Sequence, residues 1–312
     1  MRWLFLFLTT ALLASNMRDS LSKGEVGDFV VFEQNKLATL LSIHSLNKDF
    51  LIIEEISIPS HLKPKDWHSF TKNKAPQAIS HLLYEIDLTS GEVTECYSLT
   101  KKTFLPPPSF LYELIKLPLS AAQEPKKIGP PPSPESVDRR ALWSPPIVVE
   151  GVKKRASSFS ALTCLWPKDE SELSEKPITL YFVPNLPFPI YLEVNDPHYT
   201  FKLFSINSGK HLPSSCEALP RRYPSFIGGL IKGPTFYTFR LSSPTYYHSY
   251  TLKALDHETG EIYLISPTLT RQKEIVTLTF PLTQLEKNRT YTFLAVPDDF
   301  PNYYAESATI RL

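Results

Sequence analysis

The sequence predicts a mainly β protein with an N-terminal antiparallel sheet and one or two short helices, a Pro-rich linker and a C-terminal β-sandwich. Three observations lead to this prediction. Pro is abundant at 29 residues and Gly scarce at 10, Tyr (15) and Phe (19) are plentiful, and short apolar runs alternate with turn residues. Pro disrupts helix interiors, whereas aromatic and β-branched residues fit a pleated, half-buried surface. The composition therefore favours short strands joined by stiff loops.

Residues 24–104 form the first predicted domain, an antiparallel β domain with some helix. Its strand-like runs are Asp28–Gln34, Leu37–Leu46, Phe50–Ile58, Leu82–Leu88 and Glu92–Leu99. Short polar breaks between the runs suit hairpin turns, and Pro64 suits the start of a short helix. The run Phe50–Ile58 is apolar on both alternating faces, which indicates a strand covered on both sides. Adjacent Glu54 and Glu55 point to opposite faces of this strand and cannot act as a carboxylate pair.

Residues 105–146 read as a linker because eleven of them are Pro. Pro-rich chain favours an extended, semi-rigid conformation. Within it, Phe110, Leu111, Leu114 and Leu117 fall at helical spacing after the N-cap residue Ser109, which predicts a short amphipathic helix. We expect this helix to dock on the first sheet; a lid over a ligand is the alternative.

Residues 147–312 form an all-β region. The predicted strands are Ile147–Val152, Ile178–Pro184, Pro189–Val194, Tyr199–Ile206, Thr235–Leu241, Ser249–Leu255, Glu261–Ser266, Glu274–Phe280, Thr290–Val296 and Ser307–Leu312. Regular short strands with turn signals between them favour a sandwich or a barrel.

Within residues 213–312, Leu285 lies six residues before Tyr291, which enters the strand Thr290–Val296. This pattern resembles a fibronectin type III or immunoglobulin-like β-sandwich, in which such a Tyr bonds back to the preceding loop. The resemblance implies that Leu285 fills the core and Tyr291 makes this tyrosine corner. Lys287 departs from the family pattern, where Pro is common. The resemblance implies a binding or spacing module, although a fold does not define a function.

Residues 1–15 read as a signal peptide. Arg2 supplies a positive start, Trp3–Ala14 is a mostly apolar stretch of 12 residues, and the small residues Ala14 and Ser15 suit cleavage. A membrane-spanning helix needs ~20 residues, so the stretch is too short for an anchor; a buried N-terminal helix is the alternative. We expect an exported protein, in the periplasm or cell envelope if bacterial and otherwise secreted. It would contact a membrane only through the signal peptide.

Charge and motifs exclude several function classes. Lys and Arg total 33 and Asp and Glu total 32, so the chain lacks the positive excess typical of nucleic-acid-binding proteins. It contains no GxSxG, HExxH, P-loop or GxGxxG motif, and its eight scattered His residues are predicted to be structural. We therefore expect no nucleic-acid partner, no cofactor and no metal. Cys96, Cys164 and Cys216 have no CxxC spacing and are compatible with one disulfide or none.

The candidate partner-binding residues are Tyr246, Tyr247, Tyr303 and Tyr304, in two predicted loops of the C-terminal region. Tyr is favoured at interfaces because its flat ring contacts a partner at low entropic cost. The alternative is that these rings belong to the core and extend into the loops.

Three functions remain open from the sequence. The first is a non-enzymatic exported binding or scaffold protein with a protein partner. The second is an envelope carrier of a lipid or other apolar ligand, held between the first sheet and the helix that follows it. The third is a hydrolase of unrecognised type, for which no catalytic residue can be named.

Overall fold

The computed structural model describes residues 15–106, 109–122, 126–130, 132–133, 137–155, 158–196 and 198–312. The fold is mainly β, with antiparallel sheets and a few short helices, as predicted. The chain divides into two compact units, an N-terminal unit up to Leu219 and a C-terminal unit from Pro220 to Leu312. Most of the predicted signal peptide, residues 1–14, lies outside the described residues.

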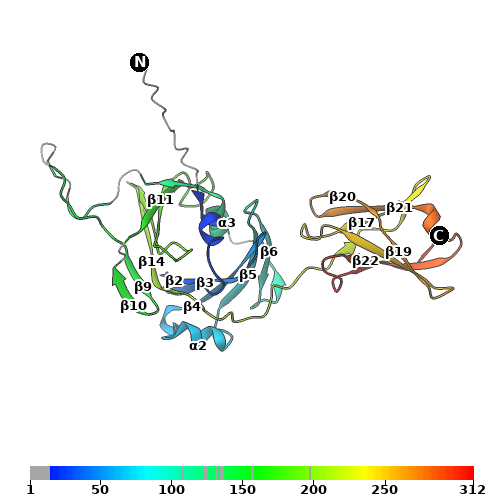
Figure 1. Ribbon diagram of the computed structural model, residues 1–312, viewed down its shortest axis with the longest axis horizontal. Coiled ribbons are helices and arrows are strands. Elements are labelled where there is room, and N and C mark those ends of the chain that lie inside the picture. Colours follow the sequence, from blue (N-terminus) through cyan, green and yellow to red (C-terminus); the bar gives the residue numbers. More distant parts are fainter. Residues whose placement is uncertain are drawn as a thin grey trace, which may run out of the picture. The chain divides into compact units, whose positions relative to one another are not determined.

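A twelve-stranded antiparallel sheet dominates the N-terminal unit. In spatial order its strands are β1 (Ser15–Asn16), β8 (Pro118–Ala121), β11 (Ser160–Leu165), β12 (Pro177–Phe182), β13 (Tyr191–Asp196), β14 (Tyr199–Gly209), β2 (Phe29–Gln34), β3 (Leu37–Leu46), β4 (Phe50–Pro59), β5 (Ser80–Asp87), β6 (Val93–Ser98) and β7 (Thr103–Phe104). The sheet curves around helix α3 (Ser109–Lys116), while α2 (Trp67–Lys72) lies outside it (Figure 1). One face of the sheet is therefore concave and the other convex.

This sheet corrects the predicted domain boundaries. We expected a domain at 24–104, a linker at 105–146 and a separate β region at 147–312. Instead, β14 pairs with β13 along its first half and with β2 along its last residues. The strands on both sides of the Pro-rich segment therefore belong to one sheet, and the units divide near Leu219.

The concave face packs against two short helices, α1 (Met17–Leu21) and α3 (Ser109–Lys116). Met17 and Leu21 of α1 and Leu114 and Ile115 of α3 are fully or almost fully buried in the largest apolar core. Burial of each such side chain contributes on the order of 1.5–3 kcal/mol. The predicted helix after Ser109 thus forms and docks on the first sheet.

The convex face is covered by separate segments. Trp67 and Phe70 of α2 pack into an apolar cluster on β2, β3 and β4. The strap, which we define as residues 212–219, runs across the same face and buries Leu212 and Leu219. A hairpin of β9 (Pro146–Val149) and β10 (Val152–Arg155) covers a third area, where one strand at Ile147–Val152 was predicted. That prediction was wrong because positive φ angles at positions 150 and 151 turn the chain.

The C-terminal unit consists of two five-stranded antiparallel sheets. The first contains β15 (Ser225–Phe226), β16 (Ile231–Lys232), β17 (Phe236–Ser242), β20 (Thr268–Gln272) and β21 (Ile275–Pro281); the second contains β18 (Tyr250–Asp256), β19 (Ile262–Ile265), β22 (Thr290–Pro297), β23 (Ala305–Glu306) and β24 (Ile310–Arg311). Phe239, Phe280 and Phe293 lie in its buried core. Leu285 is buried, and the Tyr291 hydroxyl accepts a hydrogen bond of 3.1 Å from the Glu286 N–H, as expected.

Two further predictions concern the thiols and the membrane. Cys96, Cys164 and Cys216 are all free, which corresponds to the alternative without a disulfide. Among the helices in the described part of the chain, none has the length and apolar character needed to cross a bilayer.

Candidate functional site

Two of the four predicted partner-binding tyrosines lie in the core of the C-terminal unit. Tyr246 is 5% exposed and Tyr247 is fully buried. Their rings lie 6.2 and 5.4 Å from the ring of Phe300, so the two predicted loops do come together. The Tyr247 hydroxyl donates to the carbonyl of Arg222, and the Tyr246 hydroxyl accepts from the N–H of Arg222. These two rings hold the loops to the sandwich and leave little surface of their own for contact with a partner.

The other two tyrosines are more accessible. Tyr303 is half-buried against the ring of Tyr223, with 5.1 Å between centroids. Tyr304 is 46% exposed. The exposed part of the predicted patch is therefore reduced to little more than one ring, which is a small contact area for a protein partner.

A cavity of about 480 Å³ opens on the concave face of the N-terminal sheet. It is lined by Met17, Phe32, Gln34, Asn35, Leu37, Thr39, Leu41, Glu55, Leu114, Leu173, Phe188, Pro189, Leu192, Tyr199, Phe201 and Leu203. Strands far apart in sequence supply this lining because β14 pairs with β2. Helices α1 and α3 each contribute one side chain, so they close part of the cavity.

The strand period explains why this lining is apolar. Tyr199, Phe201 and Leu203 are alternate residues of β14 and therefore point to the same face of the sheet. Phe32 of β2 and Leu41 of β3 extend this surface across the neighbouring strands. All five side chains are only partly buried, although they pack at the edge of the main apolar core. The concave face thus presents core-type residues whose apolar surface is incompletely covered.

Among the described residues that line the cavity, Glu55 is the one with a carboxyl group. Leu51 and Ile53, which share its face of β4, lie in the main core. Burial raises the pKa of Glu55, although a hydrogen bond from the Tyr84 hydroxyl, 2.9 Å from Oε2, counteracts part of this effect. The cavity therefore combines a wide apolar wall with one carboxyl group that can bond a polar group of a ligand.

The adjacent residue Glu54 faces the convex side, which confirms that the two carboxylates point in opposite directions. Its Oε1 lies 2.8 Å from His81 Nε2, and Ser215 donates to it through its hydroxyl and through its N–H at 3.2 Å. Burial would raise the pKa of Glu54, but the hydrogen bonds from His81, Ser215 and Ser214 outweigh it and hold the pKa below its usual value.

This convex-side cluster contains the residue types of a catalytic triad but not its geometry. In a triad the hydroxyl and the carboxylate bind different nitrogens of the imidazole. Here Ser215 Oγ lies 3.2 Å from the same Nε2 that bonds Glu54. Burial and the charge of Glu54 raise the pKa of the Cys216 thiol to about 12, which leaves it protonated and weakly nucleophilic. The cluster therefore gives no support to the hydrolase alternative.

The sequence indicated the orientation of Glu55 and, as an alternative, a ligand between the first sheet and the helix after Ser109, but not that β14 supplies part of the cavity lining. The alternation of β4 indicates which side chains share a face, whereas the pairing of β14 with β2 joins segments about 170 residues apart and leaves no local signal. The available sequence signal was the alternation of Tyr199, Phe201 and Leu203 along β14, because it indicates a strand with one apolar face.

Comparisons with known proteins give a family match without a function. Residues 39–155 match the family model described as CT021 protein. Among solved structures, the 2.0 Å resolution structure of the hypothetical protein CT021 from Chlamydia trachomatis is similar, with 21% sequence identity and a TM-score of 0.48. The similarity covers 66% of this chain and 98% of that chain. No curated protein matches.

Proposed function

We propose that the N-terminal unit binds a small ligand with a long apolar body and one polar group that is neutral or cationic. The cavity on the concave face is the observation that carries the proposal. Its volume of about 480 Å³ lies within the range of ~300–1,000 Å³ typical of small-molecule sites. The second of the three functions, an apolar-ligand carrier, therefore replaces the tyrosine-based scaffold as the leading one.

The apolar wall determines how large the ligand must be. Burial of one methylene group contributes ~0.8 kcal/mol, while association costs ~4–15 kcal/mol in lost freedom. A ligand that binds mainly by apolar contact must therefore bury on the order of ten methylene equivalents. A lipid acyl chain or an extended ring system meets this requirement, whereas a small polar metabolite does not.

Glu55 determines which polar group is accepted. An anionic group beside this carboxyl in a low-dielectric cavity would be repelled or would force the carboxyl to hold a proton. A hydroxyl, amide or ammonium group can bond to Glu55 directly. The site therefore favours long-chain alcohols, amides and amines over fatty-acid anions.

The other regions fit a carrier that works outside the cytoplasm. The predicted signal peptide supports export to an envelope or extracellular space, where apolar molecules need a carrier between membranes. The C-terminal unit acts in this proposal as a fibronectin type III-like spacer, supported by buried Leu285 and the hydrogen bond of Tyr291 to its preceding loop.

A neutral fluorescent apolar probe, N-phenyl-1-naphthylamine, tests the proposal by titration. Leu203→Trp fills the cavity and should weaken probe binding at least ~10-fold, equivalent to ~1.4 kcal/mol. Leu165→Trp is the matched control because Leu165 is 63% exposed on β11 of the same unit, outside the cavity. Circular dichroism would establish that both variants are folded. Equal probe affinity for wild type and Leu203→Trp would overturn the proposal.

A displacement series tests the polar-group preference separately. Dodecylamine and dodecanol should displace the probe at lower concentration than dodecanoate. Glu55→Gln should reduce the difference between amine and carboxylate, because the charge of the side chain is removed while its size is kept. A preference for dodecanoate in the wild type would contradict the role given to Glu55.

A further inference from the structure

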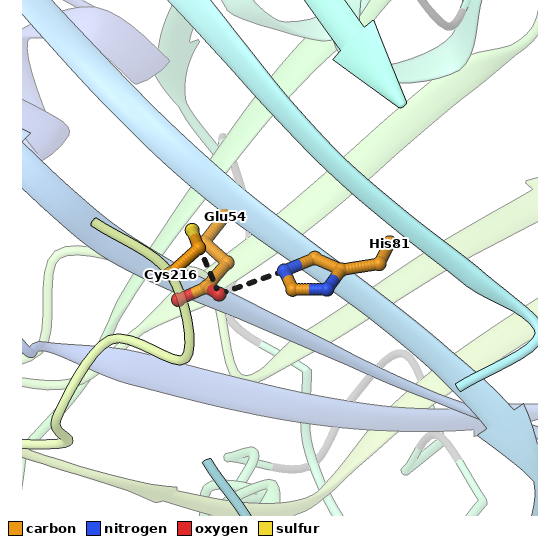
Figure 2. Close-up of side chains that lie close together, drawn as sticks. All are labelled: Glu54, His81 and Cys216. Atoms are coloured by element: carbon orange, nitrogen blue, oxygen red, sulfur yellow. Dashed lines mark hydrogen bonds and ion pairs between the residues drawn. The ribbon is translucent and has the colours of Figure 1, made fainter. Parts of the chain in front are cut away.

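The strap brings a third chain segment to the convex-side cluster. Glu54 comes from β4, His81 from β5 and Cys216 from the strap, and the three side chains converge in Figure 2. One donor atom from each residue can be chosen so that all three lie within 4.8 Å of one another. Cys216 Sγ lies 3.5 Å from Glu54 Oε1, and His81 Nε2 lies 2.8 Å from the same oxygen. A carboxylate oxygen, an imidazole nitrogen and a sulfur thus lie close together. The Ser215 hydroxyl bonds the same Glu54 oxygen and lies 3.2 Å from His81 Nε2, so it must rotate away when an ion binds.

Two of the three interatomic distances are close to those of a tetrahedral zinc site, and the third, between Cys216 Sγ and the His81 nitrogen, is within 4.8 Å. Bonds of 2.0–2.1 Å to nitrogen or oxygen and 2.3 Å to sulfur place neighbouring ligand atoms roughly 3.3–3.7 Å apart. The sulfur–oxygen distance already fits, and the nitrogen–oxygen distance must open by about 0.5–0.9 Å, which side-chain rotation can supply. The donor set is also selective, because thiolate and imidazole favour Zn²⁺ over Mg²⁺ and Ca²⁺.

We propose that Glu54, His81 and Cys216 bind one Zn²⁺ ion. On binding, the Cys216 thiol releases its proton to solvent and the sulfur coordinates as a thiolate. Its negative charge and that of Glu54 balance the two positive charges of zinc, while His81 coordinates as a neutral imidazole. The bound cluster is therefore neutral, which suits a site where Glu54 is fully buried and His81 is 8% exposed.

Neighbouring groups orient the Glu54 ligand and leave room for a fourth ligand from solvent. The Ser214 hydroxyl, 3.1 Å from Glu54 Oε2, and the Ser215 N–H orient the carboxylate, as second-shell partners do in zinc sites. A hollow beside the cluster is lined by residues including Lys72, Lys74 and Leu99. Three protein ligands with a solvent-facing fourth position form the arrangement that accepts a water or an anion.

This site is independent of the proposed ligand cavity because it lies on the other face of β4. A bound ion would also cross-link segments of the N-terminal unit. The ion would join the strap to the neighbouring strands β4 and β5, close to the point where the chain leaves the N-terminal unit at Leu219. Zinc should therefore raise the thermal stability of the N-terminal unit, because it binds the folded state preferentially.

Metal titration of the full-length protein under reducing conditions tests the inference. After treatment with a chelator and its removal, the protein should take up one Zn²⁺ per chain. Cobalt substitution should give a sulfur-to-cobalt charge-transfer band and the intense visible bands of tetrahedral Co²⁺. The absence of stoichiometric uptake, or a cobalt spectrum without sulfur ligation, would overturn the assignment.

Variants locate the ion. Cys216→Ser should weaken zinc binding by at least ~100-fold, beyond the 10–100-fold cost typical of second-shell changes. Cys96→Ser is the matched control, because Cys96 is a free cysteine of the same unit that lies on the concave side. Thermal unfolding in the presence of a chelator would show that both variants fold. The cobalt spectrum of the wild-type protein tests sulfur ligation even if a variant does not fold. An equal loss of zinc affinity in the two variants, or no loss of zinc affinity in Cys216→Ser, would place the metal elsewhere.

Discussion

The two faces of β4 carry adjacent carboxyl groups with opposite surroundings. Glu54, on the convex face, receives hydrogen bonds from His81 and from two serines of the strap, and its pKa is held low. Glu55, on the concave face, receives one from the Tyr84 hydroxyl, and burial raises its pKa. A single step along the strand therefore leads from a buried carboxylate with several hydrogen-bond donors to a carboxyl group whose burial is only partly compensated.

This difference separates two roles. On the convex face, protein groups supply the hydrogen bonds that Glu54 accepts. The Glu54 carboxylate therefore fastens the strap to the sheet. The concave face leaves Glu55 and several half-buried apolar side chains beside a cavity. A carboxyl group with incomplete partners next to an apolar wall is what a ligand site offers before its ligand arrives.

The largest expected effect comes from Glu54→Gln. The variant removes the charge that several buried donors bind and presents an amide to some of them, so it should destabilise the N-terminal unit by about 3 kcal/mol at neutral pH. Because the pKa of Glu54 is lowered in the folded state, the wild type loses this advantage as the pH falls through that lowered pKa. Urea unfolding in the presence of a chelator measures both effects. A loss of unfolding free energy below about 1 kcal/mol would show that Glu54 contributes no more to stability than a typical hydrogen bond, and the contrast between the two faces would fail.

An intermediate effect is expected from Tyr84→Phe on the concave face. Tyr84 is fully buried, and its hydroxyl bonds Glu55. Removing this hydrogen bond should cost about 1 kcal/mol of unfolding free energy. The same variant should raise the pKa of Glu55 further, which carbon-13 NMR of the Glu side chains would detect. A cost as large as that of Glu54→Gln would mean that Glu55 depends on its protein partner as Glu54 does.

The smallest expected effect comes from Glu55→Gln. Because the pKa of Glu55 is raised in the folded state, the folded wild type binds the carboxyl proton more tightly than the unfolded chain does. It therefore loses stability as the pH rises from the ordinary pKa of Glu to the raised pKa of Glu55. The Gln variant does not titrate there, so it should equal or exceed the wild type by up to about 1 kcal/mol at neutral pH. Parallel unfolding curves at acidic and neutral pH test this sign. Marked destabilisation at neutral pH would contradict the contrast between the two carboxyls.

The local pattern of the sequence predicted much of this contrast. Alternation in Phe50–Ile58 placed the two carboxyls on opposite faces, and turn residues located most strands to within a few positions. Hairpin pairing is local, so it follows from neighbouring residues. The helix after Ser109 was also predicted, because its apolar spacing differs from that of a strand.

Non-local features could not be predicted in this way. The ion-binding cluster joins residues separated by 27 and 162 positions, and no motif spacing connects them. The Pro-rich segment was read as a linker because composition does not show that β8 joins the sheet by pairing with β11. Tyr246 and Tyr247 were assigned to a surface because loop tyrosines look the same in sequence whether they face solvent or a core.

Native mass spectrometry of the protein, purified gently from its own host, would show whether the cavity of the N-terminal unit holds a small molecule. We expect a bound molecule that leaves on denaturation, that carries a long apolar chain or ring system with a neutral or cationic group, and that is absent from Leu203→Trp. A wild-type mass that matches the polypeptide alone, or a bound molecule retained by Leu203→Trp, would mean that the cavity is not a ligand site.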